Sequence, residues 1–467
     1  MSGRKLMAVC AAASLSLMAQ SVDRTKPPET PALPAYKLPP VYETKLPNGL
    51  TVVLVEDRRF PLVTVRLSFL AGSKFDPQPL PGLAESVAAL LTEGTAKRSG
   101  RQIAEEMASI GGDLNGRSSA DVLTLSANAL AENSGKLIEI VADAARNASF
   151  PEEEVQLRKQ NRKQELMAQR STPDFLLREK FNSVVYGGHP YSRVAPTVEA
   201  LDQLDRAALA KFRDTHLAPN NATLILLGGI PPREETLRVL RQQFGDWKSR
   251  EVPAAPEAKF PKANRQIVLV DRPGSVQADI RIGQLSVTRT SPDYFPLTVG
   301  NTILGGGASS RLFNDVREKK GYAYSVYSHQ EVNRDAGYFA AATQVRNEVV
   351  VPALETMLQH LEAMGKEPVT KDELTDVKNY LSGRFVMGLE TQGGLAEQLN
   401  SVKTMGLGTD YLEKYTARIR SVEPNQIQRV GGSYISPDDA TIVVVGDAAQ
   451  IAKPLEKFGK VQVTKVD

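Results

Sequence analysis

The chain has 467 residues, enough for two to four domains of roughly 100–200 residues each. Its apolar content of 41% and charged content of 24% are typical of a globular protein. The net charge is only +3 and no long basic run is present, so nucleic acid is not expected as a partner. The short basic runs "RKQNRK" and "REKK" are expected to be solvated helix faces.

The first 21 residues resemble an export signal. Arg4 and Lys5 precede the apolar run "LMAVCAAASLSLMA", which is too short to span a bilayer. Small residues at Ala19 and Ser21 predict cleavage before Val22. The mature protein is therefore expected to be exported to the periplasm, the alternative being an unstructured apolar N-terminus.

Cys10 is the only cysteine and lies inside this signal. The mature chain would have no disulfide, no Cys-ligated metal and no Cys nucleophile. Residues 22–40 are rich in proline and predict an extended tether, and no later apolar run is long enough for a transmembrane helix.

From residue 41 onward, strand patterns alternate with long helical ones. The segments "LTVVLVED", "LVTVRLSFLAG" and "VLTLSANAL" predict strands at 50–57, 62–72 and 122–130. "GLAESVAALLTEGT", at 82–95, has the apolar stripe of an amphipathic helix. The mixture predicts an α+β fold in which helices pack on one face of a sheet.

The chain repeats itself at a long spacing. "APNNATLILLGGI" begins at 218 and "SPDDATIVVVGDA" begins at 436, each a Pro-Asx-Asx turn followed by an aliphatic strand. Long helices with acidic first turns are likewise predicted to begin near Pro151 and near Thr370. A repeat of this length indicates a duplicated domain.

We therefore predict two homologous halves, 41–245 and 262–460. The segment 246–261 between them is rich in proline and charge, as a linker should be.

At this point the chain resembles the pitrilysin-like, or M16, zinc metallopeptidases, and within them the branch of mitochondrial processing peptidase. The resemblance runs through "LPNGLTVVLVEDRRFPLVTVRLSFLAGSKFD", "GLAESVAALLTEGT", "YGGHPYSR" and "LGGGASSRLFNDVREKKGYAYSVYS". It implies two α/β-sandwich domains of the LuxS/MPP-like metallohydrolase fold.

Active members carry His-x-x-Glu-His on the helix at 82–95. In this sequence the two His positions hold Glu85 and Ala89, and the general-base position holds Ala88. The third ligand, a Glu, falls near Glu165, which is equally well explained as a solvated carboxylate. A methyl group neither binds zinc nor accepts a proton, so the chain is expected to hold no metal and to need no cofactor of its own.

The four histidines of the chain show no i, i+4 pairing and are expected to be structural: His189, His216, His329 and His360. His189, in "HPY", is expected to hold a loop.

The resemblance also implies an Arg and a Tyr seven residues apart that hydrogen-bond substrate near the scissile bond. "VREKKGYAYS" supplies Arg317 and Tyr324, with Tyr322 as the competing phenol. Both groups are good donors to an oxyanion. The alternative is an Arg at a helix end and a Tyr packed in a strand.

Two further segments are candidate substrate contacts. Gly305, Gly306 and Gly307 predict a flexible loop with positive φ, as in the glycine-rich loop of the non-catalytic mitochondrial subunit. The segment 111–130 corresponds to the family's peptide-binding edge strand, with Asn115 at the backbone-contacting position and Gly116 where Ala is usual.

These features predict a zinc-free subunit of a heteromeric peptidase, paired with a zinc-bearing M16 subunit and an extended peptide substrate. The alternative is a non-enzymatic peptide-binding or scaffold subunit, like the M16-derived core proteins of respiratory complexes. A stand-alone protease would need zinc held through Glu85 and other oxygens.

Overall fold

The computed structural model describes residues 36–465, except 256, 258, 262 and 263. The predicted signal peptide and the tether up to residue 35 lie outside the described residues. The last tether residues form neither helix nor strand, and Tyr36 and Leu38 pack against a hydrophobic core. Within the described ranges, no helix has both the length and the apolar character needed to cross a membrane.

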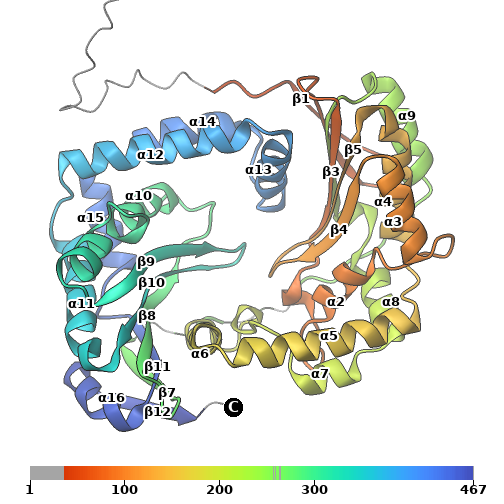
Figure 1. Ribbon diagram of the computed structural model, residues 1–467. Helices are drawn as coiled ribbons and strands as arrows, with labels where there is room; N and C mark the ends of the chain where they lie inside the picture. The colour runs from red at the N-terminus through yellow and green to blue at the C-terminus, as the bar shows by residue number, and fades with distance from the viewer. Residues whose placement is uncertain (1–35, 256, 258, 262–263, 466–467) are drawn as a thin grey trace, which may run out of the picture. The chain divides into compact units, whose positions relative to one another are not determined.

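Each half contains one six-stranded sheet (Figure 1). In spatial order, the first sheet consists of β1 (Val41–Lys45), β2 (Thr51–Glu56), β6 (Ala222–Gly228), β3 (Leu62–Phe69), β5 (Leu123–Leu130) and β4 (Asp113–Ser118). The second consists of β12 (Val461–Lys465), β7 (Gln266–Asp271), β11 (Thr441–Gly446), β8 (Gln277–Ser286), β10 (Gly337–Arg346) and β9 (Ala323–Val332).

Helices connect and cover these strands. The first half contains α2 (Leu83–Leu90), α3 (Gly100–Ser109), α4 (Ser134–Asn147), α5 (Glu152–Arg170), α6 (Pro173–Tyr186), α7 (Val198–Gln203), α8 (Arg206–His216) and α9 (Arg233–Phe244). The second contains α10 (Tyr294–Gly305), α11 (Val350–Lys366), α12 (Lys371–Leu389), α13 (Gln392–Thr404), α14 (Asp410–Arg420), α15 (Pro424–Tyr434) and α16 (Ala448–Leu455). The described residues between α9 and β7 form neither helix nor strand beyond turns.

The predicted duplication is confirmed by the topology. The two repeated aliphatic segments form β6 and β11, which hold the third place in their sheets. The two predicted long helices are α5 and α12, and α12 begins with a capping box between Thr370 and Glu373. The sheets differ at one edge, where β1 pairs antiparallel with β2 but β12 pairs parallel with β7.

The alternation within β3 shows why each sheet has two unlike faces. Val63, Val65, Leu67 and Phe69 are buried in the core formed with the first half's own helices. The residues between them are polar: the hydroxyl of Ser68 donates a hydrogen bond to Oδ1 of Asn400 of α13 at 2.7 Å, and Arg66 pairs with Glu397 of α13 at 3.3 Å.

Each half lends one helix to the sheet of the other. Helix α13 packs on β3 and β6, and its apolar residues share a core with Val53 and Val55 of β2. Helix α6 packs on β8 and β11, where Phe181 and Tyr186 share a core with Val443. The expectation of helices on one face thus holds for each half's own helices, while an exchanged helix covers part of the opposite face.

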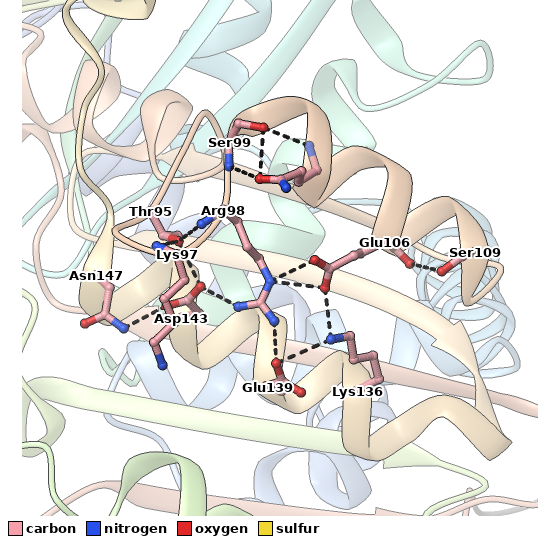
Figure 2. A network of polar contacts seen from close by, with 11 residues as sticks. Thr95, Lys97, Arg98, Ser99, Glu106, Ser109, Lys136, Glu139, Asp143 and Asn147 are labelled. Carbon is pink, nitrogen blue, oxygen red and sulfur yellow. Dashed lines mark hydrogen bonds and ion pairs between the residues drawn. The ribbon is translucent and has the colours of Figure 1, made fainter.

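A charged network fixes the loop that follows α2 (Figure 2). The guanidinium of Arg98 contacts three carboxylates: Glu106 at 3.1 Å, Asp143 at 2.6 Å, and Glu139. Lys136 adds an ion pair with Glu106 at 2.9 Å. Because these groups come from the loop, α3 and α4, the network holds all three together.

A second charged cluster joins the two halves. Nζ of the buried Lys74 lies 2.8 Å from Asp121 and 3.1 Å from Asp335, which follows β9. Tyr191 donates to the same Asp121 carboxylate at 2.6 Å, and so does the backbone N–H of Arg334 at 2.9 Å. Since breaking a buried ion pair is costly, this cluster fixes the β9–β10 turn against the first half.

Because α13 packs on the sheet of the other half, we predict that shortening one of its buried side chains destabilises the whole protein. Leu399 is fully buried in the shared core, so Leu399→Ala is expected to lower the free energy of unfolding by about 2–5 kcal/mol. Urea denaturation followed by circular dichroism measures it. The control is Leu157→Ala on α5, a leucine 49% exposed, expected to change stability by less than about 0.5 kcal/mol. Equal decreases in the free energy of unfolding in the two variants would contradict a stabilising role for the packing of α13 on the first sheet.

Candidate functional site

Helix α2 is anchored at its N-terminus by a buried carboxylate. Asp76, 4% exposed, accepts hydrogen bonds from the backbone N–H groups of Gly82 and Ala84, both at 2.7 Å. Gly82 precedes the helix with φ of 90°, a conformation that favours glycine. Burial raises the pKa of Asp76 to about 6, and the two backbone hydrogen bonds act in the opposite direction.

Glu85, on the first turn of α2, is held by two arginines of α5. Its Oε1 lies 2.7 Å from Nη2 of Arg158 and 3.0 Å from Nε of Arg162. The carboxylate that stands at the first ligand position is therefore already ion-paired within the chain.

Glu165 shares one of these arginines. Its Oε2 lies 3.5 Å from Nη1 of Arg162, whose side chain is only 7% exposed. Arg162 also donates to Oε1 of Gln169 at 3.1 Å. The structure thus brings Glu85 and Glu165 together across a guanidinium.

The other two motif positions offer no donor atom. Ala88 is fully buried and Ala89 is half-buried, and both end in a methyl group. Strand β4 approaches α2 closely here, since a Cβ at Gly116 would lie 1.9 Å from the carbonyl oxygen of Ala88. This contact requires glycine at 116, the position at which the family resemblance has Ala.

These residues do not fit a catalytic zinc ion. Zn²⁺ in such sites takes three protein ligands, whereas only two carboxylates are present and both are neutralised by arginine. Across the described ranges, no group of three or more His, Cys, Asp or Glu side chains is arranged to hold a metal.

Arg317 and Tyr324 lie next to each other. The guanidinium carbon of Arg317 is 5.1 Å from the ring centroid of Tyr324 and 4.6 Å from that of Phe313. Tyr324 is 87% exposed at the start of β9, whereas the competing Tyr322 packs against the core of the second half. Arg317 belongs to a π-helical segment, Phe313–Lys319, a rare geometry often found at functional sites.

Asn115 lies on β4, which is the free edge of the first sheet. It lines a groove of about 650 Å³ together with hydroxyl and charged side chains, among them Arg66, Ser126 and Asn400. The groove is lined by the polar face of the first sheet, by α13 and by the end of β9, which contributes Glu331. An exposed strand edge beside a polar groove is suited to an extended peptide backbone.

Comparison with known proteins gives a consistent picture. A family model described as Insulinase (Peptidase family M16) matches residues 51–195, and one described as Peptidase M16 inactive domain matches residues 203–381. The chain belongs to the M16 peptidase family.

Alignments with related proteins cover most of this M16 chain. An uncharacterized zinc protease of Streptomyces coelicolor is 27% identical over 398 residues, covering 84% of this chain and 86% of the relative. The uncharacterized zinc protease YmxG of Bacillus subtilis is 25% identical over 348 residues, covering 74% and 83%.

Solved structures agree in fold. A peptidase M16 inactive domain from Pseudomonas fluorescens has a TM-score of 0.81 and 25% identity, covering 87% of this chain and 98% of that one. A protease from Helicobacter pylori also has a TM-score of 0.81, at 21% identity, covering 87% and 100%.

The glycine triplet of this M16 chain differs from the prediction. Positive φ was expected at Gly305, Gly306 and Gly307, but none of them has it. Gly305 is the last residue of α10, and a Cβ there would lie 2.4 Å from the backbone nitrogen of Ser328 in β9. Close packing of helix on strand, and not a left-handed backbone, therefore explains this glycine.

The histidines occupy separate structural positions. Nδ1 of His189 accepts a hydrogen bond from the backbone N–H of Tyr191 at 3.2 Å, and its ring stacks on Phe260 at 4.6 Å. His189 therefore holds a loop, as expected. His216 packs against Phe212, and the other two contact a tyrosine and an aspartate: His329 with Tyr338, and His360 with Asp315.

The sequence reasoning missed Arg162. The run "RKQNRK" was expected to be a solvated face, but Arg162 is buried and ion-paired. Val155 and Leu166 are buried on the same helix, and Arg162 follows Val155 by seven residues. Helical periodicity could therefore have identified Arg162 as a charge on the buried face.

The cap of α2 predicts a pH-dependent mutational effect. Asp has a pKa of 3.8 in the unfolded chain but about 6 at Asp76. The folded protein thus binds this proton more tightly, and the contribution of Asp76 to the free energy of unfolding falls as pH rises from 4 to 7. Because Asn does not titrate, the destabilisation by Asp76→Asn is expected to be larger at pH 4 than at pH 7, by up to about 3 kcal/mol.

Urea unfolding at the two pH values measures this difference. Asp113→Asn, at an exposed carboxylate of β4, is the control and is expected to show none. A cost of Asp76→Asn that does not vary with pH would rule out the buried-carboxylate interpretation.

Proposed function

We propose that this M16 chain is a peptidase subunit that binds extended peptides and supplies Arg317 and Tyr324 to a zinc-bearing M16 partner. One observation carries the proposal: the Arg–Tyr pair lies together at the surface, while the motif positions on α2 hold Ala88 and Ala89. Such a chain keeps donors for a substrate carbonyl but has no means of activating water.

The chemistry assigned to the pair follows from its donors. Peptide hydrolysis places negative charge on the carbonyl oxygen, and a guanidinium and a phenol both donate to that oxygen. The side chain of Arg317 is 36% exposed and that of Tyr324 extends further into solvent, so both can reach a peptide outside this chain. Zinc on the partner subunit would acidify the attacking water.

Peptide binding is assigned to the groove beside β4. Main-chain pairing along a free strand edge gives affinity with little demand on sequence. Asn115 and the open polar face beside it provide donors and acceptors for the peptide backbone and side chains.

A non-enzymatic peptide-binding or scaffold role is the second candidate. The observation in its favour is that Arg317 also stacks on Phe313 and lies 3.4 Å from Glu318, contacts that suit a packing residue. In this role the groove would function without the Arg–Tyr pair.

Reconstitution with the zinc-bearing partner separates the two candidates. The mature chain alone is expected not to cleave a quenched fluorescent peptide, and mixing with an M16 subunit that carries His-x-x-Glu-His is expected to give cleavage. In that mixture Arg317→Ala should lower kcat/KM by about 10²–10³-fold, the cost of losing one oxyanion donor. Tyr324→Phe should lower it by a smaller factor.

The control is Arg420→Ala, at an exposed arginine of α14, which is expected to leave cleavage unchanged. Full activity of the Arg317→Ala complex would sink the catalytic proposal. Peptide binding without cleavage in any mixture would support the scaffold candidate.

We also propose export, supported by the charged and apolar N-terminal pattern. Mass spectrometry of the protein from a periplasmic fraction is expected to give Val22 as the first residue. An intact N-terminus beginning with Met1, recovered from the cytoplasm, would contradict it.

A further inference from the structure

The two carboxylates left at the former ligand positions need an explanation of their own. Glu85 is only partly exposed and is committed to Arg158 and Arg162, and Glu165 contacts the same Arg162.

The burial of Arg162 supplies the physical reason. Its side chain is 7% exposed, and a charge removed from water in this way must be compensated by neighbours of opposite sign. Glu85 at 3.0 Å and Glu165 at 3.5 Å are those neighbours, and they approach different nitrogens of the guanidinium.

We propose that Arg162 takes the place of the metal ion in this chain: its guanidinium is the cation shared by Glu85 and Glu165, and it keeps the site closed to Zn²⁺. A dication bound by both carboxylates would have to lie beside the guanidinium, and the two positive charges would repel each other in a partly buried site. The charge of Arg162 would thus oppose zinc binding in addition to the loss of the two histidines.

The proposal makes a prediction about restoring ligands. Glu85→His with Ala89→His places two imidazoles four residues apart on α2, next to Glu165. This double variant is expected to bind Zn²⁺ poorly because Arg162 remains. Adding Arg162→Ala frees Glu165 and removes the charge of Arg162, while Arg158 stays in every variant. This triple variant is expected to bind one Zn²⁺ per chain at least ten-fold more tightly than the double variant.

Isothermal titration of each full mature chain with Zn²⁺ alone measures the affinities, and the melting temperature provides an independent reading. The double variant leaves Arg162 short of a counter-ion and should melt below the wild type, and Arg162→Ala in that background should recover part of the loss. The matched control adds Arg170→Ala to the double variant instead. Arg170 is on the same helix and pairs with Glu179 at 3.4 Å, away from Glu85.

Tighter binding in the Arg162→Ala triple variant but not in the Arg170→Ala control supports the proposal. Equal affinity in the double and triple variants, or no stoichiometric zinc in the triple variant, overturns it.

A second measurement does not depend on whether these variants fold. Arg162→Ala and Glu85→Gln are made singly and together in the otherwise natural chain. If the two groups neutralise each other, the loss of melting temperature in the pair should be smaller than the summed single losses. Additive losses would overturn the assigned role of Glu85.

Discussion

One face of each sheet packs against the helices of its own half. The opposite face is partly apolar, and the structure depends on covering that apolar part. In the first sheet, β2 and β6 present Val53, Val55, Ile225 and Leu227 on that face, all fully buried. Exposing side chains of this size costs about 1.5–3 kcal/mol each, so the face needs a cover. A helix from the opposite half provides it in each sheet, and separating the halves would expose both faces. The duplicated domains are therefore one folding unit in energetic terms.

The same exchange creates the groove. Helix α13 covers the apolar part of the first sheet's face and contacts the polar Arg66 and Ser68 of β3, and the polar face beyond it leads to the free edge of β4. The cluster of Lys74, Asp121 and Asp335 then fixes the β9–β10 turn against the first half. Packing and electrostatics thus leave open the part of the sheet that is suited to a peptide, because its side chains need no apolar cover.

The two candidate sites differ in whether their arginine is buried or lies at the surface. On α2 and α5, Arg162 is buried and its charge is satisfied within the chain by Glu85 and Glu165. In the π-helical segment and at the start of β9, Arg317, which also pairs with Glu318, and Tyr324 remain at the surface, where another molecule can reach them. The first arrangement stabilises a helix pair, and the second has little to contribute to stability. This contrast is the physical basis for assigning structure to one site and function to the other.

Features that depend on local order could be predicted from the amino-acid sequence alone. Alternation predicted β2, β3 and β5, the repeat predicted equivalent places for β6 and β11, and the motif positions showed Ala88 and Ala89. The spacing of Arg317 and Tyr324 was also visible. Tertiary packing was needed to reveal the helix exchange, the burial of Arg162 and the close contacts that require Gly116 and Gly305. Each of these is set by a neighbour distant in the chain, such as Glu85 for Arg162, and no local pattern specifies which distant group will be adjacent.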